Sequence, residues 1–105
     1  MGTIVIVVYK PHAGKAKDLE ELVARHVPVL RMEKLATERQ PVMMRAADGS
    51  IVEVFEWVST KAIEAAHNNP RVQELWAQFE KICTYERADS LPEFRELFSS
   101  FESIN

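Results

Sequence analysis

The pattern of apolar and polar residues is most regular between Ser50 and Val58, where it predicts a β-strand. Successive side chains of a strand point to opposite faces, so each face of this segment carries three apolar residues and one acid. A strand with one solvated face would instead alternate apolar and polar residues. The segment is therefore predicted to be a central strand that is covered on both faces.

Three further segments predict strands. Thr3–Tyr9 is β-branched almost throughout, and so little polarity on either face indicates a second central strand. Val42–Ala47 and Thr84–Ala88 are the other two. The pair Asp48-Gly49 predicts a two-residue hairpin turn between Val42–Ala47 and the central strand.

The predicted turn fixes a register for this hairpin. Ala46 would lie opposite Ile51, and Arg45 would share the face of the central strand that carries Glu56. A one-residue bulge would reverse the faces of one strand. Because a buried charge is costly unless it is paired, Arg45 is expected to meet Glu56 or Glu53, within the chain or across a dimer.

Helical periodicity appears first after Lys15. Apolar residues recur at intervals of three and four positions and form one stripe. Pro28 predicts a kink or a restart, with helix resuming through Arg31–Thr37. The stripe consists of Ala16, Leu19, Leu22, Val23, His26, Val27 and Leu30.

Two more helices are predicted after the central strand. Ser59 or Thr60 caps the first, Lys61–His67, while Asn69 as cap and Pro70 as first residue begin the second. The apolar stripe of the second helix consists of Val72, Leu75, Trp76, Phe79, Ile82 and Cys83.

The C-terminal region is less regular. Ser90-Leu91-Pro92 predicts the start of a short helix with Phe94 and Leu97 turned inward. The last segment, Phe98–Ile104, is open between a continuation of that helix and an edge strand.

This order of elements predicts an α+β fold. Strand, helix, strand, strand, helix, strand is the βαββαβ arrangement of ferredoxin-like domains, with a four-stranded antiparallel sheet and the helices on one face. Residues 1–105 are expected to form a single domain. The other face of the sheet is also apolar, and the tail is too short to cover it alone. The sequence therefore predicts a homodimer in which two sheets pack face to face.

Composition narrows the classes of partner and compartment. The net charge of −3, with no cluster of Lys and Arg, argues against a nucleic-acid partner. The single cysteine, Cys83, excludes an internal disulfide and fits a reducing compartment. The opening apolar run, Ile4–Val8, is too short for a signal sequence or a membrane span. A cytoplasmic protein without a membrane partner is expected.

One stretch of the chain resembles a known family. Glu53–Ser59, followed by Ala62, Ala66-His67, Asn69-Pro70 and Leu75-Trp76, is similar to the antibiotic biosynthesis monooxygenase-like branch of the dimeric α/β-barrel superfamily. The resemblance implies a barrel of two ferredoxin-like protomers with a small organic molecule held between sheet and helices. The best-known enzymes of these families oxidise phenolic polyketides with molecular oxygen and without metal or flavin. Other branches degrade haem, isomerise lactones or have no known reaction.

The haem-degrading branch is not expected to include this chain. That branch uses an Asn, a Trp and a His, and its Trp lies in the helix after the central strand. When the sequences are aligned on Trp57, the Trp and His positions fall on Ala66 and Trp76, and the first strand has no Asn.

Two histidines are candidate catalytic bases. His26 lies on an otherwise apolar helix stripe, so its ring needs a partner, for which Glu53, Glu56 and Tyr9 are candidates. The alternative is a core histidine whose hydrogen bonds are satisfied. His67 ends a predicted helix, where it would be either a proton acceptor or a residue favoured by the helix dipole.

Four other residues are candidates for substrate binding. Trp57 and Trp76 could wall an aromatic pocket, although Trp76 at helical spacing is also typical of a core residue. Arg45 and Tyr85 complete the set. No metal or other cofactor is expected, because Glu64 and His67 alone do not make a di-iron motif.

The residues leave three kinds of function open. The first is a cofactor-independent monooxygenase, or a related enzyme, acting on a planar aromatic or enolisable substrate. The second is a module that binds a small molecule without turning it over. The third is a dimeric interaction domain whose cleft is filled by its own side chains.

Overall fold

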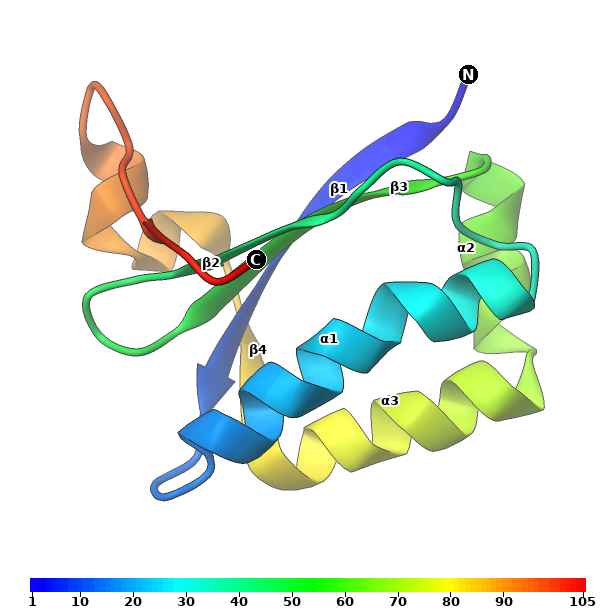
Figure 1. Cartoon of the computed structure of the whole chain (residues 1–105), viewed down its shortest axis with the longest axis horizontal. Helices are drawn as coiled ribbons and strands as arrows, with labels where there is room; N and C mark the ends of the chain where they lie inside the picture. The colour runs from blue at the N-terminus through cyan, green and yellow to red at the C-terminus, as the bar shows by residue number, and fades with distance from the viewer.

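The central strand predicted from the sequence is the middle of an antiparallel sheet. The computed structural model describes residues 1–105 as an α+β fold with five strands in the order β4-β1-β3-β2-β5 and three α-helices (Figure 1). The strands are β1 (Thr3–Pro11), β2 (Val42–Arg45), β3 (Ile51–Trp57), β4 (Cys83–Glu86) and β5 (Glu102–Ser103). The helices are α1 (Ala16–Met32), α2 (Thr60–His67) and α3 (Pro70–Ile82), with two 3₁₀ turns, η1 (Ala88–Ser90) and η2 (Pro92–Arg95).

The fifth strand corrects the expected four. β5 pairs with β2 through Met44 opposite Ser103 and Arg45 opposite Glu102. Asn105 extends this edge, because its side-chain oxygen accepts from the backbone N–H of Met43 at 3.0 Å. Of the two alternatives for Phe98–Ile104, the edge strand is therefore the one that forms.

The helices cover one face of the sheet. α1 and α3 lie side by side beneath it, and α2 lies below the end of β3 (Figure 1). The side chains of β3 that point to the helices are all buried, namely Ile51, Glu53, Phe55 and Trp57. Together with the apolar stripes of α1 and α3 they make the main core, as the helical periodicity predicted.

The opposite face, which we call the outer face, is covered only in part. Residues of the C-terminal segment pack there, and Leu91 is buried against Val8 and Val52. Phe94 packs against this cluster as predicted. Leu97 does not turn inward as predicted. Its side chain lies at the tip of the segment and is 92% exposed.

The β2–β3 hairpin differs from the prediction by one residue. Arg45 lies opposite Ile51, not Ala46. The turn has three residues, because the N–H of Gly49 bonds to the oxygen of Ala46 at 3.0 Å and the N–H of Ala46 bonds to Ser50 at 2.8 Å. Gly49 takes a φ of 92°, the conformation that a type I turn followed by a bulge requires. The shift moves Arg45 to the helix-covered face of the sheet.

Helix α1 also differs from its predicted course. It runs through Pro28, whose ring is exposed, and neither restarts there nor continues to Thr37. It ends because Lys34 takes a φ of 60° and the N–H of Leu35 bonds back to the oxygen of Leu30 at 2.8 Å. The chain then turns to pair with the end of β3.

The predicted helix starts after the central strand are confirmed. The Ser59 hydroxyl accepts from the N–H of Ala62 at 3.2 Å, which settles the choice between Ser59 and Thr60. Asn69 accepts from the N–H of Arg71 at 3.0 Å and precedes Pro70. None of the helices has the length and apolar character needed to cross a membrane.

Candidate functional site

A buried polar cluster lies between the sheet and the helices. His26 of α1 is 4% exposed and Glu53 of β3 is 1% exposed. Nδ1 of His26 lies 2.9 Å from Oε1 of Glu53, and the hydroxyl of Tyr9 donates to the same oxygen at 2.7 Å. A buried carboxylate needs such donors, because desolvation is otherwise uncompensated. Both partners are among those that the sequence offered for His26.

Trp76 of α3 decides which nitrogen of His26 carries the proton. The indole N–H of Trp76, which can only donate, points to Nε2 of His26 at 3.1 Å. Nε2 must therefore accept, and the proton of the neutral ring lies on Nδ1, where it is donated to Glu53. The three side chains form one directed chain of hydrogen bonds from Trp76 through His26 to Glu53.

Tyr9 remains protonated in this cluster. Burial of its ring, followed by the negative charge of Glu53, raises the pKa of Tyr9 well above its ordinary value of 10. Its ring also stacks on Phe79, with centroids 5.0 Å apart. Tyr9 therefore holds Glu53 in place as a hydrogen-bond donor.

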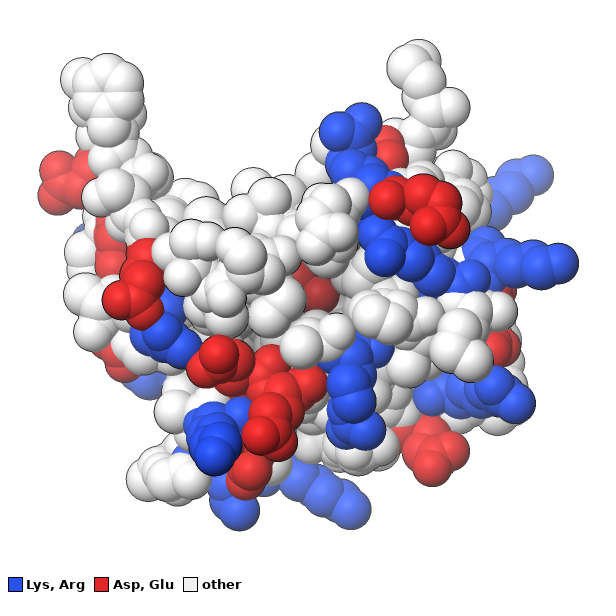
Figure 2. Space-filling view, in the orientation of Figure 1, with Lys and Arg blue, Asp and Glu red and all other residues white.

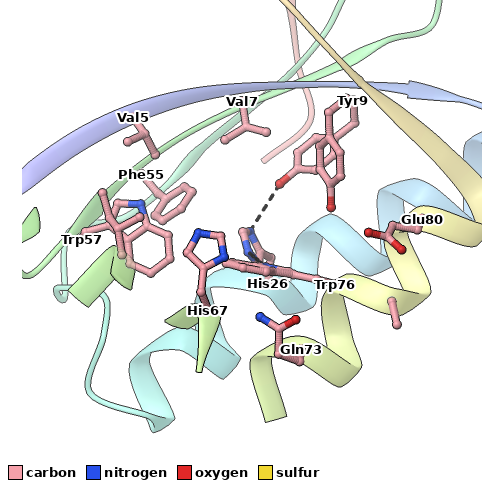
Figure 3. A pocket seen from close by; sticks show the side chains of 13 residues that line it. Val5, Val7, Tyr9, His26, Phe55, Trp57, His67, Gln73, Trp76 and Glu80 are labelled. Carbon is pink, nitrogen blue, oxygen red and sulfur yellow. Dashed lines mark hydrogen bonds between the residues drawn. The ribbon is translucent and has the colours of Figure 1, made fainter. Parts of the chain in front are cut away.

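A cavity of about 550 Å³ opens above this cluster. Figure 3 shows the side chains that surround it, with the rings of Phe55 and Trp57 on one side and Tyr9 on the other. The volume is typical of a site for a small organic molecule. The cavity is lined by Val5, Val7, Tyr9, His26, Phe55, Trp57, Ile63, His67, Gln73, Trp76, Ala77, Glu80 and Tyr85.

The structure brings together most of the candidate site residues. His26, Trp57 and Trp76 line the interior of the cavity, and the exposed side chains of His67 and Tyr85 lie at its mouth. About half of the Tyr85 side chain is covered, and this partial burial, followed by the charges of neighbouring groups, raises the pKa of Tyr85 to about 12.

Arg45 lies elsewhere. It is not part of the cavity, and its guanidinium pairs with Glu20 of α1 at 2.7 Å and with Glu102 of β5. These partners replace Glu53 and Glu56, which were expected from the sequence. The reason is the three-residue turn, which places Arg45 beside α1 and the last strand.

The two histidines differ in their surroundings. The ring of His67 accepts and donates no hydrogen bond within the chain, and it contacts Trp76 edge-on with centroids 5.2 Å apart. His26 is held on both nitrogens. Only His26 is therefore oriented by the protein. No group of three or more His, Cys, Asp or Glu side chains comes together in a way that could hold a metal.

Sequence reasoning missed two polar residues of the cavity, Gln73 and Glu80. They lie on α3 together with Trp76 and Ala77. Their spacing of three, four and seven residues from Gln73 places all four on one helical face. Because Gln and Glu at such positions are ordinary on a solvated helix, this signal becomes informative only once Trp76 is known to face a cavity.

Comparisons of the chain with protein-family models, with curated proteins and with solved structures gave no match. The function is therefore argued from the cavity and its side chains.

Proposed function

We propose that the protein is an enzyme acting on a small planar aromatic or enolisable molecule, which loses a proton to Nε2 of His26. The observation that carries this proposal is the 2.9 Å contact between Nδ1 of His26 and the buried carboxylate of Glu53 beside an apolar cavity. A carboxylate that accepts from Nδ1 orients the imidazole so that Nε2 is the basic atom. It also stabilises the imidazolium that forms when Nε2 takes a proton.

The resemblance to antibiotic biosynthesis monooxygenase-like proteins supports a second step after proton removal, which is oxidation of the substrate by molecular oxygen. A deprotonated, electron-rich substrate can give its electrons to molecular oxygen. In the net reaction a CH₂ group and O₂ become a carbonyl group and water. The chain's own residues would bind the substrate, remove the proton and exclude water. Such an enzyme would need no metal or flavin.

Trp76 sets a condition on this role. Its indole N–H donates to Nε2 of His26 in this structure, so the base is not free. The Trp76 side chain is only half-buried and lies at the cavity wall, where an entering ligand can displace it. If Trp76 kept its bond to His26, the cavity would hold a ligand without turnover. The same bond therefore supports the second candidate function, a non-catalytic binding module.

The ferredoxin-like fold and the homodimer are part of the proposal. The strand order β4-β1-β3-β2 and the placement of the helices agree with a ferredoxin-like domain to which β5 has been added.

On the outer face, Ile6 lies opposite Val54, which in turn lies opposite Val42. Ile6 is 54% exposed and Val42 is 48% exposed. Figure 2 shows that a hollow on this side, between the C-terminal segment and the N-terminus, is floored mainly by uncharged side chains. A second copy packed on this face would bury the row.

Proton removal is tested with anthrone, a planar ketone that has one enolisable CH₂ group. The wild-type protein is expected to accelerate the loss of deuterium from labelled anthrone in water, measured by proton NMR. His26→Gln should lower the rate by at least about a hundredfold, because general-base catalysis contributes on that scale. His67→Gln is the matched control, since it changes the other imidazole of the same cavity.

Two results would redirect the proposal. If the His26→Gln variant keeps the wild-type rate, His26 is not the base. If only His67→Gln loses the rate, His67 is the base instead. Binding of anthrone with no exchange in any variant would favour the binding module. Where exchange is seen, oxygen uptake with the same variants then tests the oxygenase step.

The dimer is tested separately by light scattering. Wild-type protein is expected at twice the mass of one chain, and Ile6→Asp at the mass of one chain, because a charge would be buried at the centre of the interface. Met32→Asp is the control, since Met32 is 70% exposed at the end of α1, away from the outer face. A wild-type mass that stays at one chain as concentration rises would refute the dimer.

A further inference from the structure

The cavity carries charge of one sign only. None of its lining residues is Lys or Arg, whereas Glu80 lies at its mouth and Glu53 lies directly behind Tyr9 and His26. Glu80 takes part in no ion pair within the chain. The next residue along α3, Lys81, lines a different groove between α1 and α3. The negative charge of Glu80 is therefore not neutralised by the protein.

Aromatic rings make up much of the remaining wall. The faces of such rings carry partial negative charge and attract cations that lie over them within about 6 Å of the centroid. Figure 3 shows Trp76 beneath the cavity and Glu80 on the same helix, at the end of the cavity opposite Trp57. The rings are those of Tyr9, Phe55, Trp57, Trp76 and Tyr85.

The titration of the two tyrosines agrees with a negative field. After burial, the charges that raise the pKa of Tyr85 are those of Cys83, Glu80 and Glu53. Glu53 has the same effect on Tyr9. A field that opposes the formation of tyrosinate also opposes the entry of any other anion.

The hydrogen-bonding group at the floor of the cavity also disfavours an anion. Nε2 of His26 is an acceptor, which is satisfied by the indole N–H of Trp76. A ligand that takes the place of this indole must bring a donor of its own, since an unpaired buried acceptor is costly. A neutral enol or hydroxyl group can donate there, whereas a carboxylate has no donor.

We propose that the natural ligand of this cavity is a planar aromatic molecule bearing a protonated amine, with the amine held among the aromatic rings by Glu80. This inference rests on the proposed function of the cavity as the ligand site and names the chemical class that the site selects. Aromatic carboxylates and phosphates are rejected.

The test is a matched set of ligands that differ only in the group on a naphthalene ring. Binding of 2-naphthylmethylammonium, 2-naphthylmethanol and 2-naphthoate is measured by calorimetry at pH 8 and low salt, where charges are least screened. The ammonium is expected to bind about fivefold or more tightly than the alcohol, as cation–π contacts and one partly exposed carboxylate allow. The carboxylate is expected to bind more weakly than the alcohol.

Two variants test whether the preference for the ammonium ligand depends on Glu80. Glu80→Gln should lower the ratio of ammonium to alcohol affinity about threefold, because it removes the charge and keeps the shape. Glu74→Gln should leave the ratio unchanged, since Glu74 lies on the same helix but outside the cavity. An unchanged ratio in Glu80→Gln would overturn the role of Glu80.

The outcomes separate the two proposals. If the alcohol or the carboxylate binds as tightly as the ammonium, the ligand class is wrong and the cavity remains a site for aromatic molecules. If none of the three binds, the cavity is not such a site, and the proposed function is refuted together with the ligand class.

Discussion

Replacement of Tyr9 by Phe removes one hydroxyl group and leaves the ring that stacks on Phe79. The main bond lost is the 2.7 Å contact to Glu53, whose side chain is 1% exposed, so water cannot replace it; the hydroxyl also lies 3.4 Å from Nδ1 of His26. A hydrogen bond to a charged buried group contributes about 1.5–3 kcal/mol. We therefore expect Tyr9→Phe to lower the free energy of unfolding by about 2 kcal/mol.

Urea unfolding followed by circular dichroism at one fixed protein concentration measures this loss. With a typical slope, about 2 kcal/mol moves the midpoint by roughly 1 M urea. Tyr85→Phe is the matched control, because the Tyr85 hydroxyl makes no hydrogen bond within the chain and its side chain is 49% exposed. Its effect should stay within about 0.5 kcal/mol.

A double-mutant cycle shows whether the hydroxyl acts through Glu53. In a Glu53→Gln background the same bond joins two neutral groups and contributes about 1 kcal/mol. Tyr9→Phe should therefore cost about 1 kcal/mol less there than in the wild type. Equal costs in the two backgrounds, or a Tyr9→Phe variant as stable as Tyr85→Phe, would refute the description of Glu53 as a buried carboxylate held by Tyr9.

Three substitutions and one labelling experiment test other parts of the structure. Gly49→Ala should lower the stability by about 1 kcal/mol in thermal unfolding, because the φ of 92° strains any residue with a Cβ atom. Lys34→Gly should raise the stability by up to about 1 kcal/mol in the same assay, since the φ of 60° suits glycine. Arg45→Ala should cost less than about 1 kcal/mol, because its ion pairs are solvent-exposed, and should leave ligand affinity in calorimetry unchanged. Cys83 should react with iodoacetamide at pH 8 only after unfolding, followed by mass spectrometry, because burial raises the pKa of its thiol to about 11.

Local signals in the sequence were sufficient for much of the fold. The apolar run of β3 predicted a central strand, and Asn69-Pro70 predicted where α3 begins. Each of these depends on residues that are close together in the chain. The turn at Gly49 shows the limit, because Asp48-Gly49 fits both a two-residue loop and a three-residue loop. The choice between them is made by packing and moves Arg45 from one face of the sheet to the other.

The site was predictable to a similar degree. His26 on an apolar stripe required a polar partner, and Glu53 and Tyr9 were both among those expected. The bond from Trp76 to His26 joins residues on two helices whose relative position no local pattern specifies. The tautomer of His26 and the charge of the cavity both depend on that arrangement, so only the structure could supply them.

The short strand β5 has a consequence for how the protein behaves in concentrated solution. Its residues and Asn105 occupy the outward backbone groups of β2, and the N–H of Ile104 bonds to the oxygen of Met43 at 2.9 Å. An unoccupied strand edge is a template on which other chains can add strands and grow into aggregates. Residues 102–105 therefore cover the edge of β2 and prevent other chains from pairing with it. Deleting them would remove few contacts, but it would expose this edge and favour the formation of fibres.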